Sequence, residues 1–410
     1  MPPGVRLRSL TVAALIGVAG PCHPPGEGLD HRAQKSVEPP SEPPYDRGMQ
    51  SMPSPQEMER AYRRSDQSYD GVFFVAVRTT SIFCRPSCPA RKPLPKNVEY
   101  FDTARAALFS GYRPCKRCRP MHTDGQPPEW AERLLAAVDR EPTSRFRDAD
   151  LRAMSIEPTR ARRYFKQHYA MTFQAYNRAR RVGEALRRIR NGADLTEVAM
   201  EHGFESDSGF RDAFARIIGR TPGRSRRADC IVSRMLKSPI GPLMACATES
   251  AVCFLEFTDR RALEAQLAIM GRRFDRPAVP GSNKHLKHLA AELARYFAGQ
   301  LSEFTVPLEY PGTPFQTAVW DQLRRIPYGR TCSYEQLARN AGRRGAQRAA
   351  GTANGKNRIA ILIPCHRVVN KNGELGGYGG GLWRKRFLLD LEQRVAGAAN
   401  QAGRQGSAMD

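Results

Sequence analysis

Four cysteines in the first third of the chain form two close pairs with the spacing of metal ligands. The pairs lie in the segments FCRPSC and RPCKRC, which a loop of 26 residues joins. Two close pairs joined by a long loop can converge on a tetrahedral site, and four thiolates suit Zn²⁺ in a structural position. A purely structural zinc knot is the simplest interpretation of such a site. The sequence therefore predicts one zinc ion with four ligands: Cys84, Cys88, Cys115 and Cys118.

A further cysteine is followed directly by a histidine in the motif ILIPCHRVV, where Cys365 and His366 are neighbours. A reactive cysteine needs a base that takes its proton and a further group that holds the base. Adjacency alone does not supply this arrangement, because neighbouring side chains on an extended backbone point to opposite faces. The pair is therefore a candidate nucleophile and base whose partners must come from elsewhere in the chain.

The charge of the chain points to a polyanionic partner. Its 65 lysines and arginines exceed its 41 acidic residues and leave a formal net charge of +24, which favours nucleic acid. No apolar run reaches the roughly 18 residues of a membrane-spanning helix, so an integral membrane protein is excluded. Ten cysteines in 410 residues are too few for a disulfide-stapled secreted fold, and we expect a reducing, cytoplasmic setting. At roughly 100 to 200 residues per domain, the length predicts several domains.

The first 51 residues need a separate interpretation. Residues 6–22 have the basic start, short apolar stretch and small residues of a secretory signal, but Pro21 before Cys22 fits a lipoprotein cleavage site poorly. Residues 24–55 are rich in Pro, Glu and Ser and have no hydrophobic period, so we expect them to be disordered. The alternative is a later start, at Met49, Met52 or Met58.

The segment around the cysteine pairs resembles the amino-terminal domain of the Ada family, the adaptive-response regulators of alkylation damage. The resemblance rests on DGVFFVAVRTTSIFCRPSC followed by RPCKRC. It implies that Cys84 accepts a methyl group from a DNA methylphosphotriester and that the other three cysteines are its companion ligands. Residues 81–120 hold nine lysines and arginines against two acids, and such a surface attracts DNA phosphates. The predicted DNA contacts of this domain are Thr80, Arg91 and Arg113.

Metal binding explains how such a cysteine could react and signal. A zinc-held sulfur stays a thiolate at neutral pH, so the nucleophile needs no neighbouring base. Four thiolates on Zn²⁺ leave the site with a net negative charge, and methylation of Cys84 removes one unit of it. The affinity for the phosphate backbone should then rise, and the lesion would switch on its own sensor.

A helical region in the middle of the chain has the pattern of a helix-turn-helix unit. In DLTEVAMEHGFESDSGFRDAFARIIGRTP, Asp194 can cap a first helix, Gly203 allows a tight turn, and a second helix starts near Ser206. Ser208 and Arg211 on this second helix would face a DNA groove. The segment resembles the carboxy-terminal half of AraC-type DNA-binding domains.

An earlier segment, DADLRAMSIEPTRARRYFKQHYAMTFQAY, resembles the first half of an AraC-type domain with two departures. Arg152 stands where a small residue usually packs, and Glu157 stands where a serine cap is usual. These departures weaken the prediction that this half reads bases.

The last third of the chain resembles the O6-alkylguanine-DNA alkyltransferases. After a basic linker ending near Ser238, PIGPLMACATESAVCFLEF predicts two strands around a turn, followed by a helix over 284–298. This part resembles the small ribonuclease-H-like α/β domain that precedes their catalytic domain. From TPFQTAVWDQLRRIPYGRTCSYEQLA to Glu392 the resemblance is to the catalytic domain itself, of winged-helix-like fold, and PCHRV is its decisive motif.

This second resemblance assigns roles to residues around Cys365. It implies that His366 deprotonates Cys365 through a bridging water, that Glu392 holds the imidazole, and that Asn357 braces the site by hydrogen bonds. Because the O6 substituent of a stacked guanine cannot reach a buried thiolate, the nucleotide must leave the duplex. The implied DNA-binding residues are Tyr334 at the phosphate and guanine N3, Arg348 in the vacated stack, Tyr378 in the lid of the guanine pocket, and Arg367.

Other positions depart from the family or take no part in it. Gly379 stands where many relatives carry Ser, and Arg358 replaces the Pro that often follows the hinge asparagine. Neither change removes a reacting group. The remaining cysteines lack a basic partner at motif spacing and are expected to be inert core or linker residues: Cys230, Cys246, Cys253 and Cys332.

The whole order of segments resembles the Ada family and predicts a multidomain α+β fold. The expected parts are a disordered extension or misassigned start (1–51), a zinc-binding methylphosphotriester domain (52–122), an AraC-type helix-turn-helix domain (126–226), a ribonuclease-H-like subdomain (236–312), an alkyltransferase catalytic domain (313–396) and a disordered tail (397–410).

The resemblance implies a suicidal repair protein with two acceptors. Cys365 would take methyl from O6-methylguanine and O4-methylthymine, and Cys84 from methylphosphotriesters, the latter converting the protein to a transcriptional activator. The expected partners are alkylated double-stranded DNA, promoter DNA and RNA polymerase, with no membrane, and the chain is expected to be a monomer.

Two other interpretations stay open at this point. In one, the protein only regulates transcription, which the intact PCHRV motif argues against. In the other, the zinc site is structural and only the repair chemistry survives.

Overall fold

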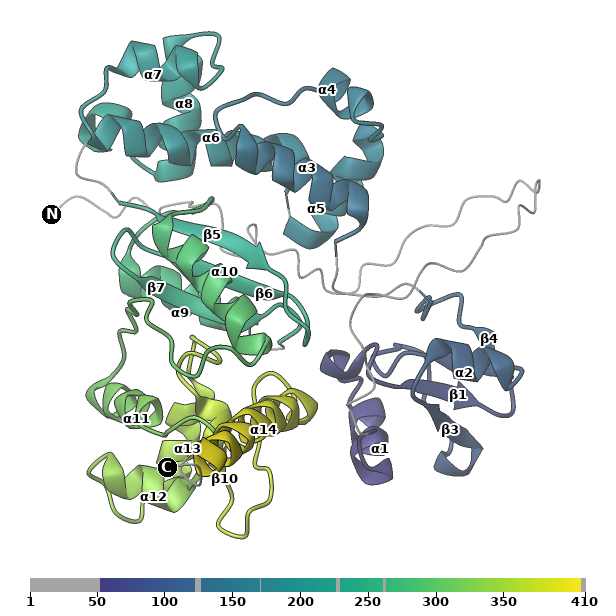
Figure 1. Ribbon diagram of the computed structural model, residues 1–410. Helices are drawn as coiled ribbons and strands as arrows, with labels where there is room; N and C mark the ends of the chain where they lie inside the picture. The colour runs from purple at the N-terminus through teal and green to yellow at the C-terminus, as the bar shows by residue number, and fades with distance from the viewer. Residues whose placement is uncertain (1–51, 122–126, 170, 226–228, 261–262, 407–410) are drawn as a thin grey trace, which may run out of the picture.

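The computed structural model describes residues 52–121, 127–169, 171–225, 229–260 and 263–406. These residues form a succession of α and β domains along the chain, as the multidomain α+β prediction requires (Figure 1). Within these ranges, no helix is long and apolar enough to cross a lipid bilayer. The expected extension at 1–51 lies outside the described residues.

The first domain is a small sheet that brings the two cysteine pairs together. Its strands lie in the order β3-β1-β2-β4, with β1 antiparallel to β2 and β3 and with β4 parallel to β2. Since β2 ends at Cys84 and Cys115 directly follows β4, one cysteine of each pair lies at the same end of the sheet. The elements are α1 (Pro55–Arg63), β1 (Phe74–Val77), β2 (Ile82–Cys84), β3 (Val98–Phe101), α2 (Ala104–Phe109) and β4 (Arg113–Pro114).

The second domain contains two helix-turn-helix pairs, α4–α5 and α7–α8, joined by the long helix α6 (Figure 1). The side chain of Asp194 caps α7, Gly203 lies in the following turn with φ +65°, and Ser206 caps α8, as the sequence predicts. Arg152 is exposed on α4, so it does not occupy a core position. The helices are α3 (Glu129–Arg140), α4 (Asp148–Ala153), α5 (Pro158–Tyr169), α6 (Phe173–Arg190), α7 (Leu195–Glu201) and α8 (Asp207–Ile218).

The third domain is a four-stranded sheet in the order β7-β6-β5-β8 with two helices. Its first strand, β5, lies in the segment predicted to be a basic linker ending near Ser238, so that prediction is wrong. The strand alternates buried and outward-facing residues, and the outward Arg234 bonds to Asp139 of α3 at 3.0 Å. The elements are β5 (Ile231–Leu236), β6 (Leu243–Ala247), β7 (Val252–Phe257), α9 (Leu263–Phe274), β8 (Ala278–Pro280) and α10 (Lys284–Phe297).

The last domain is mainly helical, with one short parallel strand pair. Strands β9 and β10 pair Cys332 with Val368, which brings the turn at Cys365 close to the start of α12. Helix α14 extends to Gly406 and so includes residues 397–406, which the sequence predicts to be a disordered tail. The elements are α11 (Pro314–Arg324), β9 (Cys332–Ser333), α12 (Tyr334–Asn340), α13 (Gln347–Gly355), the 3₁₀ turn η5 (Cys365–Arg367), β10 (Val368–Val369) and α14 (Leu382–Gly406).

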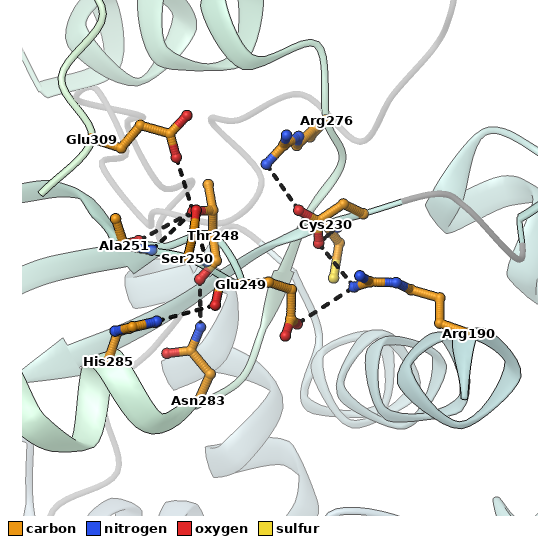
Figure 2. A network of polar contacts seen from close by, with 11 residues as sticks. Arg190, Cys230, Thr248, Glu249, Ser250, Ala251, Arg276, Asn283, His285 and Glu309 are labelled. Atoms are coloured by element: carbon orange, nitrogen blue, oxygen red, sulfur yellow. Dashed lines mark hydrogen bonds and ion pairs between the residues drawn. The ribbon is translucent and has the colours of Figure 1, made fainter. Parts of the chain in front are cut away.

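The helical domain is packed directly on the third domain. One hydrophobic cluster joins Trp130 and Phe165 of the helices to Cys246 and Phe254 of the sheet. Figure 2 shows a polar part of the same interface, in which Arg190 of α6 reaches Glu249 at 3.6 Å. The sequence predicts separate domains and gives no sign of this shared core.

The first domain contacts the last domain through the start of α14. The Trp383 indole N–H donates to the Ser68 carbonyl at 2.6 Å, and Arg386 forms an ion pair with Glu57 at 2.8 Å. Trp383 also packs against the cluster that contains Met58 and Tyr62. The two cysteine sites therefore belong to domains that touch each other.

A methyl group at position 183 is expected to destabilise the contact between α6 and β8. A Cβ at Gly183 would lie 2.7 Å from Val279 Cγ2, and Val279 is fully buried. We expect Gly183→Ala to lower the free energy of unfolding by about 1–3 kcal/mol through overpacking, which a thermal melt of the full chain would measure. In a double-mutant cycle, Val279→Ala should offset part of that loss. Strictly additive losses of unfolding free energy in the double variant would show that positions 183 and 279 are not in contact.

Candidate active sites

The four predicted zinc ligands converge at one end of the first sheet. Their Sγ atoms all lie within 4.8 Å of one another. Ligands at about 2.3 Å from a tetrahedral zinc ion are about 3.8 Å apart, so one ion fits this cluster with small adjustments. The Arg85 amide donates to Cys118 Sγ at 3.4 Å, and such a bond favours a thiolate. The donor set and the sulfur positions suit zinc.

The turn between Cys84 and Cys88 is held by side chains of the same domain. The Ser87 amide donates to Asp70 Oδ1 at 3.0 Å, and the Ser87 hydroxyl donates to the other oxygen of that carboxylate. Lys92 Nζ donates to the Cys88 carbonyl at 2.9 Å. Cys84 is only 6% exposed, so its sulfur is fixed before any substrate arrives.

The predicted DNA contacts of this domain lie on its surface. Thr80 is exposed in the turn between β1 and β2, Arg113 is exposed at the start of β4, and Arg91 is exposed in the loop after Cys88. Their side chains are accessible to a DNA backbone, and their contact with DNA stays a prediction.

Cys365 opens the 3₁₀ turn η5 and lies against Asn357. Asn357 Nδ2 donates to Cys365 Sγ at 3.1 Å and to the Ile363 carbonyl at 2.8 Å, while its Oδ1 accepts from the Ile359 amide at 2.9 Å. Both Cys365 and Asn357 are buried. The amide therefore has one fixed orientation, which matches the bracing expected of Asn357.

Glu392 lies at the centre of a buried polar network. Both Glu392 and His366 have no exposed surface. Because a carboxylate only accepts, the bond from His366 places the ring proton on Nε2 and leaves the lone pair on Nδ1. Within the described residues, this Nδ1 has no hydrogen-bond partner. Glu392 accepts from His366 Nε2 (2.9 Å), Tyr296 Oη (2.8 Å), Arg367 Nε (2.8 Å), Arg367 Nη2 (2.9 Å) and the Gly329 amide (3.2 Å).

Burial and hydrogen bonding set the charges of this network. Burial alone would raise the pKa of Glu392, but bonding to His366 and Arg367 lowers that pKa to about 2. Burial lowers the pKa of His366 despite the opposing effect of Glu392. Burial also raises the pKa of the Cys365 thiol. At neutral pH the site therefore holds a carboxylate, a neutral imidazole and a thiol that must lose its proton before it reacts.

The same network predicts a loss of stability in acid. The pKa of His366 is lower in the folded state than its unfolded value of 6.5. The stabilisation of the fold by neutral His366 is therefore complete above pH 6.5 and declines as the pH falls below that value. The contribution of Glu392 is complete above 4.5 and is lost as the pH falls toward about 2. We expect the Tm to fall between pH values of about 7 and 5, and less steeply in His366→Gln. Identical slopes of Tm against pH in the unmodified chain and in His366→Gln would contradict a buried neutral imidazole.

Arg367 does not lie where the sequence analysis places it. Its side chain is only 9% exposed. Its Nε and Nη2 donate to Glu392, and its Nη1 donates to the Ile326 carbonyl at 2.6 Å. The predicted DNA contact is therefore wrong, because the 3₁₀ turn directs both His366 and Arg367 inward toward the carboxylate.

A small cavity of about 20 Å³ opens beside Cys365. Tyr378 lines it, and the Tyr378 hydroxyl is buried without a hydrogen-bond partner among the described residues. Tyr334 begins α12, and a Cβ at Gly376 would lie only 2.9 Å from its hydroxyl, so glycine lets the pocket loop approach this ring. Arg348 is exposed on the first turn of the neighbouring α13. The structure thus places Tyr378 in the pocket wall and Tyr334 beside Gly376, and the contact of Arg348 with DNA stays a prediction.

Two cationic residues near Cys365 were missed by the sequence analysis. Lys385 is fully buried, its Nζ donates to the Val368 carbonyl at 2.6 Å, and burial lowers its pKa to about 8. Arg260 comes from the third domain and lines the cavity. Both charges lower the pKa of the Cys365 thiol against the larger effect of burial. The only sequence signal was the spacing of Glu256 and Arg260, four residues apart in LEFTDR.

The second helix-turn-helix pair carries its predicted DNA contacts on the outer face of α8. Ser208 and Arg211 are exposed there, with Arg211 bonded to Asp207 at 2.9 Å. The buried Arg181 of α6 donates to the His202 and Gly203 carbonyls and so fixes the turn. The unit is therefore rigid and presents α8 outward.

Within the part of the chain that the structure describes, four cysteines lie outside the two sites, and burial raises the pKa of each thiol. Burial raises the pKa of Cys230 and Cys253 to about 12 and that of Cys332 to about 11, and it raises the pKa of Cys246 well above its ordinary value. This agrees with the expectation that they are inert.

Four family models match successive parts of the chain. The match to the metal binding domain of Ada, together with the clustered sulfur atoms, confirms the zinc-binding prediction. The matches are the metal binding domain of Ada (57–121), a helix-turn-helix domain (151–228), the ribonuclease-like domain of 6-O-methylguanine DNA methyltransferase (231–310) and the DNA binding domain of 6-O-methylguanine DNA methyltransferase (314–394).

Individual relatives cover either most of the chain or its last part. The bifunctional transcriptional activator/DNA repair enzyme Ada of Escherichia coli is 35% identical over 337 residues, which are 80% of this chain and 93% of that protein. A methylated-DNA–protein-cysteine methyltransferase of Mycobacterium tuberculosis is 46% identical over 40% of this chain and 94% of its own length. The crystal structure of Mycobacterium tuberculosis OGT in complex with DNA is 42% identical over 40% of this chain and 94% of that chain, with a TM-score of 0.35.

Proposed function

Because this chain belongs to the Ada family of DNA repair enzymes and transcriptional activators, we propose that it transfers methyl groups from DNA to two of its own cysteines. Cys365 takes methyl from O6-methylguanine and from O4-methylthymine, and Cys84 takes it from methylphosphotriesters. The second transfer converts the protein to an activator of the alkylation response. The observation that carries the first transfer is the buried His366–Glu392 pair directly after Cys365 in the chain, in which His366 Nδ1 has no hydrogen-bond partner among the described residues.

The reaction at Cys365 is an in-line displacement in which charges and atoms balance. The proton of the thiol passes through a bridging water to Nδ1 of His366, and Glu392 stabilises the imidazolium that forms. The thiolate then bonds to the methyl carbon while the bond from that carbon to O6 breaks and its electron pair stays on guanine. A proton returned from the imidazolium neutralises the guanine. The product is S-methylcysteine, which is not regenerated, so each molecule acts once at this site.

Base extrusion is the step that the surface of the last domain must support. Unstacking a nucleotide costs a few kcal/mol, and a side chain that fills the gap offsets part of that cost. Arg348, exposed on α13, suits this role. Tyr334 lies beside Gly351 of α13, Tyr378 lines the cavity, and both suit contact with the extruded nucleotide. Cys365 receives the O6 substituent at the base of the cavity.

The transfer to Cys84 depends on the zinc ligands, on the residues that hold the turn after Cys84, and on exposed residues of the first domain that can bind DNA. The four cysteines would hold a zinc ion, and the bound ion would keep the Cys84 sulfur a thiolate at neutral pH. The Ser87–Asp70 bonds keep the turn fixed, and Thr80, Arg91 and Arg113 bind the phosphates around the lesion. Methylation removes one negative charge from the site, so the domain binds the DNA backbone more tightly afterwards.

Promoter binding is assigned to the helix-turn-helix pairs, with Ser208 and Arg211 at the groove. Activation requires RNA polymerase as a partner, and the protein works as a monomer on the chromosome in the cytoplasm. The matches to both a metal binding domain of Ada and a helix-turn-helix domain support this bifunctional role over repair alone.

Labelled DNA separates the two transfers. The full chain is incubated with duplexes that carry isotopic methyl on O6 of guanine or on a backbone phosphate, and the digested protein is mapped by mass spectrometry. Label on Cys365 from the first duplex and on Cys84 from the second is the expected result. If Cys365 stays unlabelled, the repair function is refuted. If only Cys84 stays unlabelled, the cluster is a structural zinc knot.

Removal of zinc is expected to abolish one transfer and to spare the other. Without the ion, the four clustered sulfurs lose their common ligand and Cys84 becomes an ordinary thiol. We expect a chelated sample to lose at least about 90% of phosphotriester transfer and to retain most transfer to Cys365. Mass spectrometry with both duplexes measures this, and zinc added back should restore the loss. Full phosphotriester transfer by the zinc-free protein would contradict metal activation of Cys84.

A further inference from the structure

The acceptor pocket has one wall that comes from another domain. We propose that Arg260, anchored by Glu256 and pressed against Gly379, is a specificity-determining residue that limits Cys365 to small O6 substituents such as methyl. The inference rests on the proposed function and names the substrate class of its Cys365 site. It assigns a task to a buried ion pair that the displacement itself does not use.

Arg260 is held at three points. It forms an ion pair with Glu256, its Nη2 donates to the Gly355 carbonyl at 2.7 Å, and its Nη1 donates to the Asn357 carbonyl at 3.3 Å. The side chain of Arg260 is only 9% exposed and that of Glu256 only 2%. Gly355 ends α13 and Asn357 braces Cys365, so the guanidinium is fixed relative to the acceptor sulfur.

Gly379 leaves the space that this guanidinium occupies. A Cβ at position 379 would lie 2.7 Å from Cζ, 2.8 Å from Nη2 and 2.9 Å from Nε of Arg260. Such distances are closer than ordinary contacts, so any other residue at this position would push the guanidinium away. The unusual glycine in the pocket loop and the arginine of the third domain therefore form one structural unit.

This unit sets the size and polarity of the pocket. Arg260, Glu256, Gly379 and Cys365 line the same cavity, so the guanidinium forms part of the wall beside the acceptor sulfur. A benzyl group would have to displace the guanidinium or bury its face against the charge. Displacement leaves Glu256 unpaired in a buried site, and burial of a charge without a polar partner is unfavourable. Larger substituents are therefore rejected.

The test compares two substrates in variants that remove the pair as a whole. Glu256→Gln/Arg260→Ala leaves no buried charge unpaired. Second-order rates of Cys365 alkylation are measured with duplexes that differ only in O6-methylguanine or O6-benzylguanine. We expect the benzyl-to-methyl rate ratio to rise by about tenfold or more. Arg260 also favours the thiolate of Cys365, so the double variant can lower the rates of both methyl and benzyl transfer. The benzyl-to-methyl rate ratio isolates the effect of substituent size.

A matched control removes an ion pair of the same domain away from the pocket. Arg276 pairs with Asp229 at 2.8 Å, in the region shown in Figure 2. Asp229→Asn/Arg276→Ala should leave the substrate ratio unchanged. An equal rise of the ratio in this control would overturn the inference, because the effect would then come from general loosening of the domain.

Gly379→Ala supplies a second test, which leaves Glu256 and Arg260 themselves unchanged in the first of its two backgrounds. In the unmodified chain, the added methyl group displaces Arg260, and we expect the methyl-transfer rate to fall by about tenfold. In the Glu256→Gln/Arg260→Ala background the same change should have little effect. Equal losses in both backgrounds, or an unchanged substrate ratio with methyl transfer intact, would overturn the inference. Absence of methyl transfer in the unmodified chain would refute the proposed function instead.

Discussion

Cys365→Ala is expected to lose methyl transfer from O6-methylguanine by at least about 10⁴-fold, because the residue is the covalent acceptor and no other group can replace its sulfur. The other cysteines of the third and last domains are buried or half-buried thiols with raised pKa values. The hydrogen bond from Asn357 Nδ2 goes to the sulfur of Cys365. The substitution removes only one sulfur atom from the pocket, so the fold should persist. Single-turnover assays with an O6-methylguanine duplex measure the loss.

The reciprocal variant makes the result specific. Cys365→Ala should still take methyl from phosphotriester DNA at Cys84, whereas Cys84→Ser should lose that transfer and keep the one at Cys365. Cys246→Ala is the matched control, since Cys246 is also a buried thiol and lies in the β6 strand. Methyl label from O6-methylguanine anywhere in Cys365→Ala would show that a different residue is the acceptor.

The zinc centre was predictable because its geometry is largely local. Cys84 and Cys88 flank one short turn, and Cys115 and Cys118 flank another. The only long-range fact that the sequence lacked is the parallel pairing of β2 with β4, which places the two turns together. The caps and the glycine turn of α7–α8 are local in the same sense, and Asp194 and Gly203 were read correctly from their neighbours.

The acceptor site around Cys365 was only partly predictable because its contacts join distant segments. The PCHRV motif shows that a histidine and an arginine follow the cysteine, but it does not show which way a 3₁₀ turn directs them. The structure turns Arg367 inward, where its charge is matched by Glu392. Arg260 lies in a different domain, and nothing in its immediate sequence indicates that it reaches the pocket.

The packing of the helical domain on the third domain was the largest feature that the sequence did not predict, and the reason is physical. The strand β5 carries Arg234 and Lys237 on or beside its outward side, so its composition resembles a basic linker. Those cations meet Asp139 and Glu132 of α3 across the domain interface. A charged strand can be stable when a neighbouring domain supplies the opposite charge, and local composition does not reveal that neighbour.

Glu392→Ala is expected to lower the free energy of unfolding by about 3–5 kcal/mol, because it leaves the buried Arg367 charge without its partner. It should also slow methyl transfer to Cys365 by about 10²–10⁴-fold, the usual contribution of a positioned general base. The bond that Glu392 accepts from His366 Nε2 fixes the tautomer of His366, and the charge of Glu392 stabilises the imidazolium. Thermal melts and single-turnover assays measure the two effects separately.

Glu392→Gln and Tyr296→Phe separate the charge of this residue from its hydrogen bonds. The glutamine keeps the volume but removes the negative charge that pairs with Arg367, so we expect a smaller loss of stability than in Glu392→Ala and a rate loss of similar size. Tyr296→Phe removes one donor to Glu392 and should cost about 1 kcal/mol with little change in rate. If Glu392→Gln transferred methyl at the unmodified rate, the carboxylate would not be needed to hold a basic imidazole, and Cys365 would have to lose its proton by another route. The hydrogen bond from Asn357 and the charges of Arg260 and Lys385 would then be the influences that make the thiolate accessible, since they lower the pKa of Cys365 against the effect of burial.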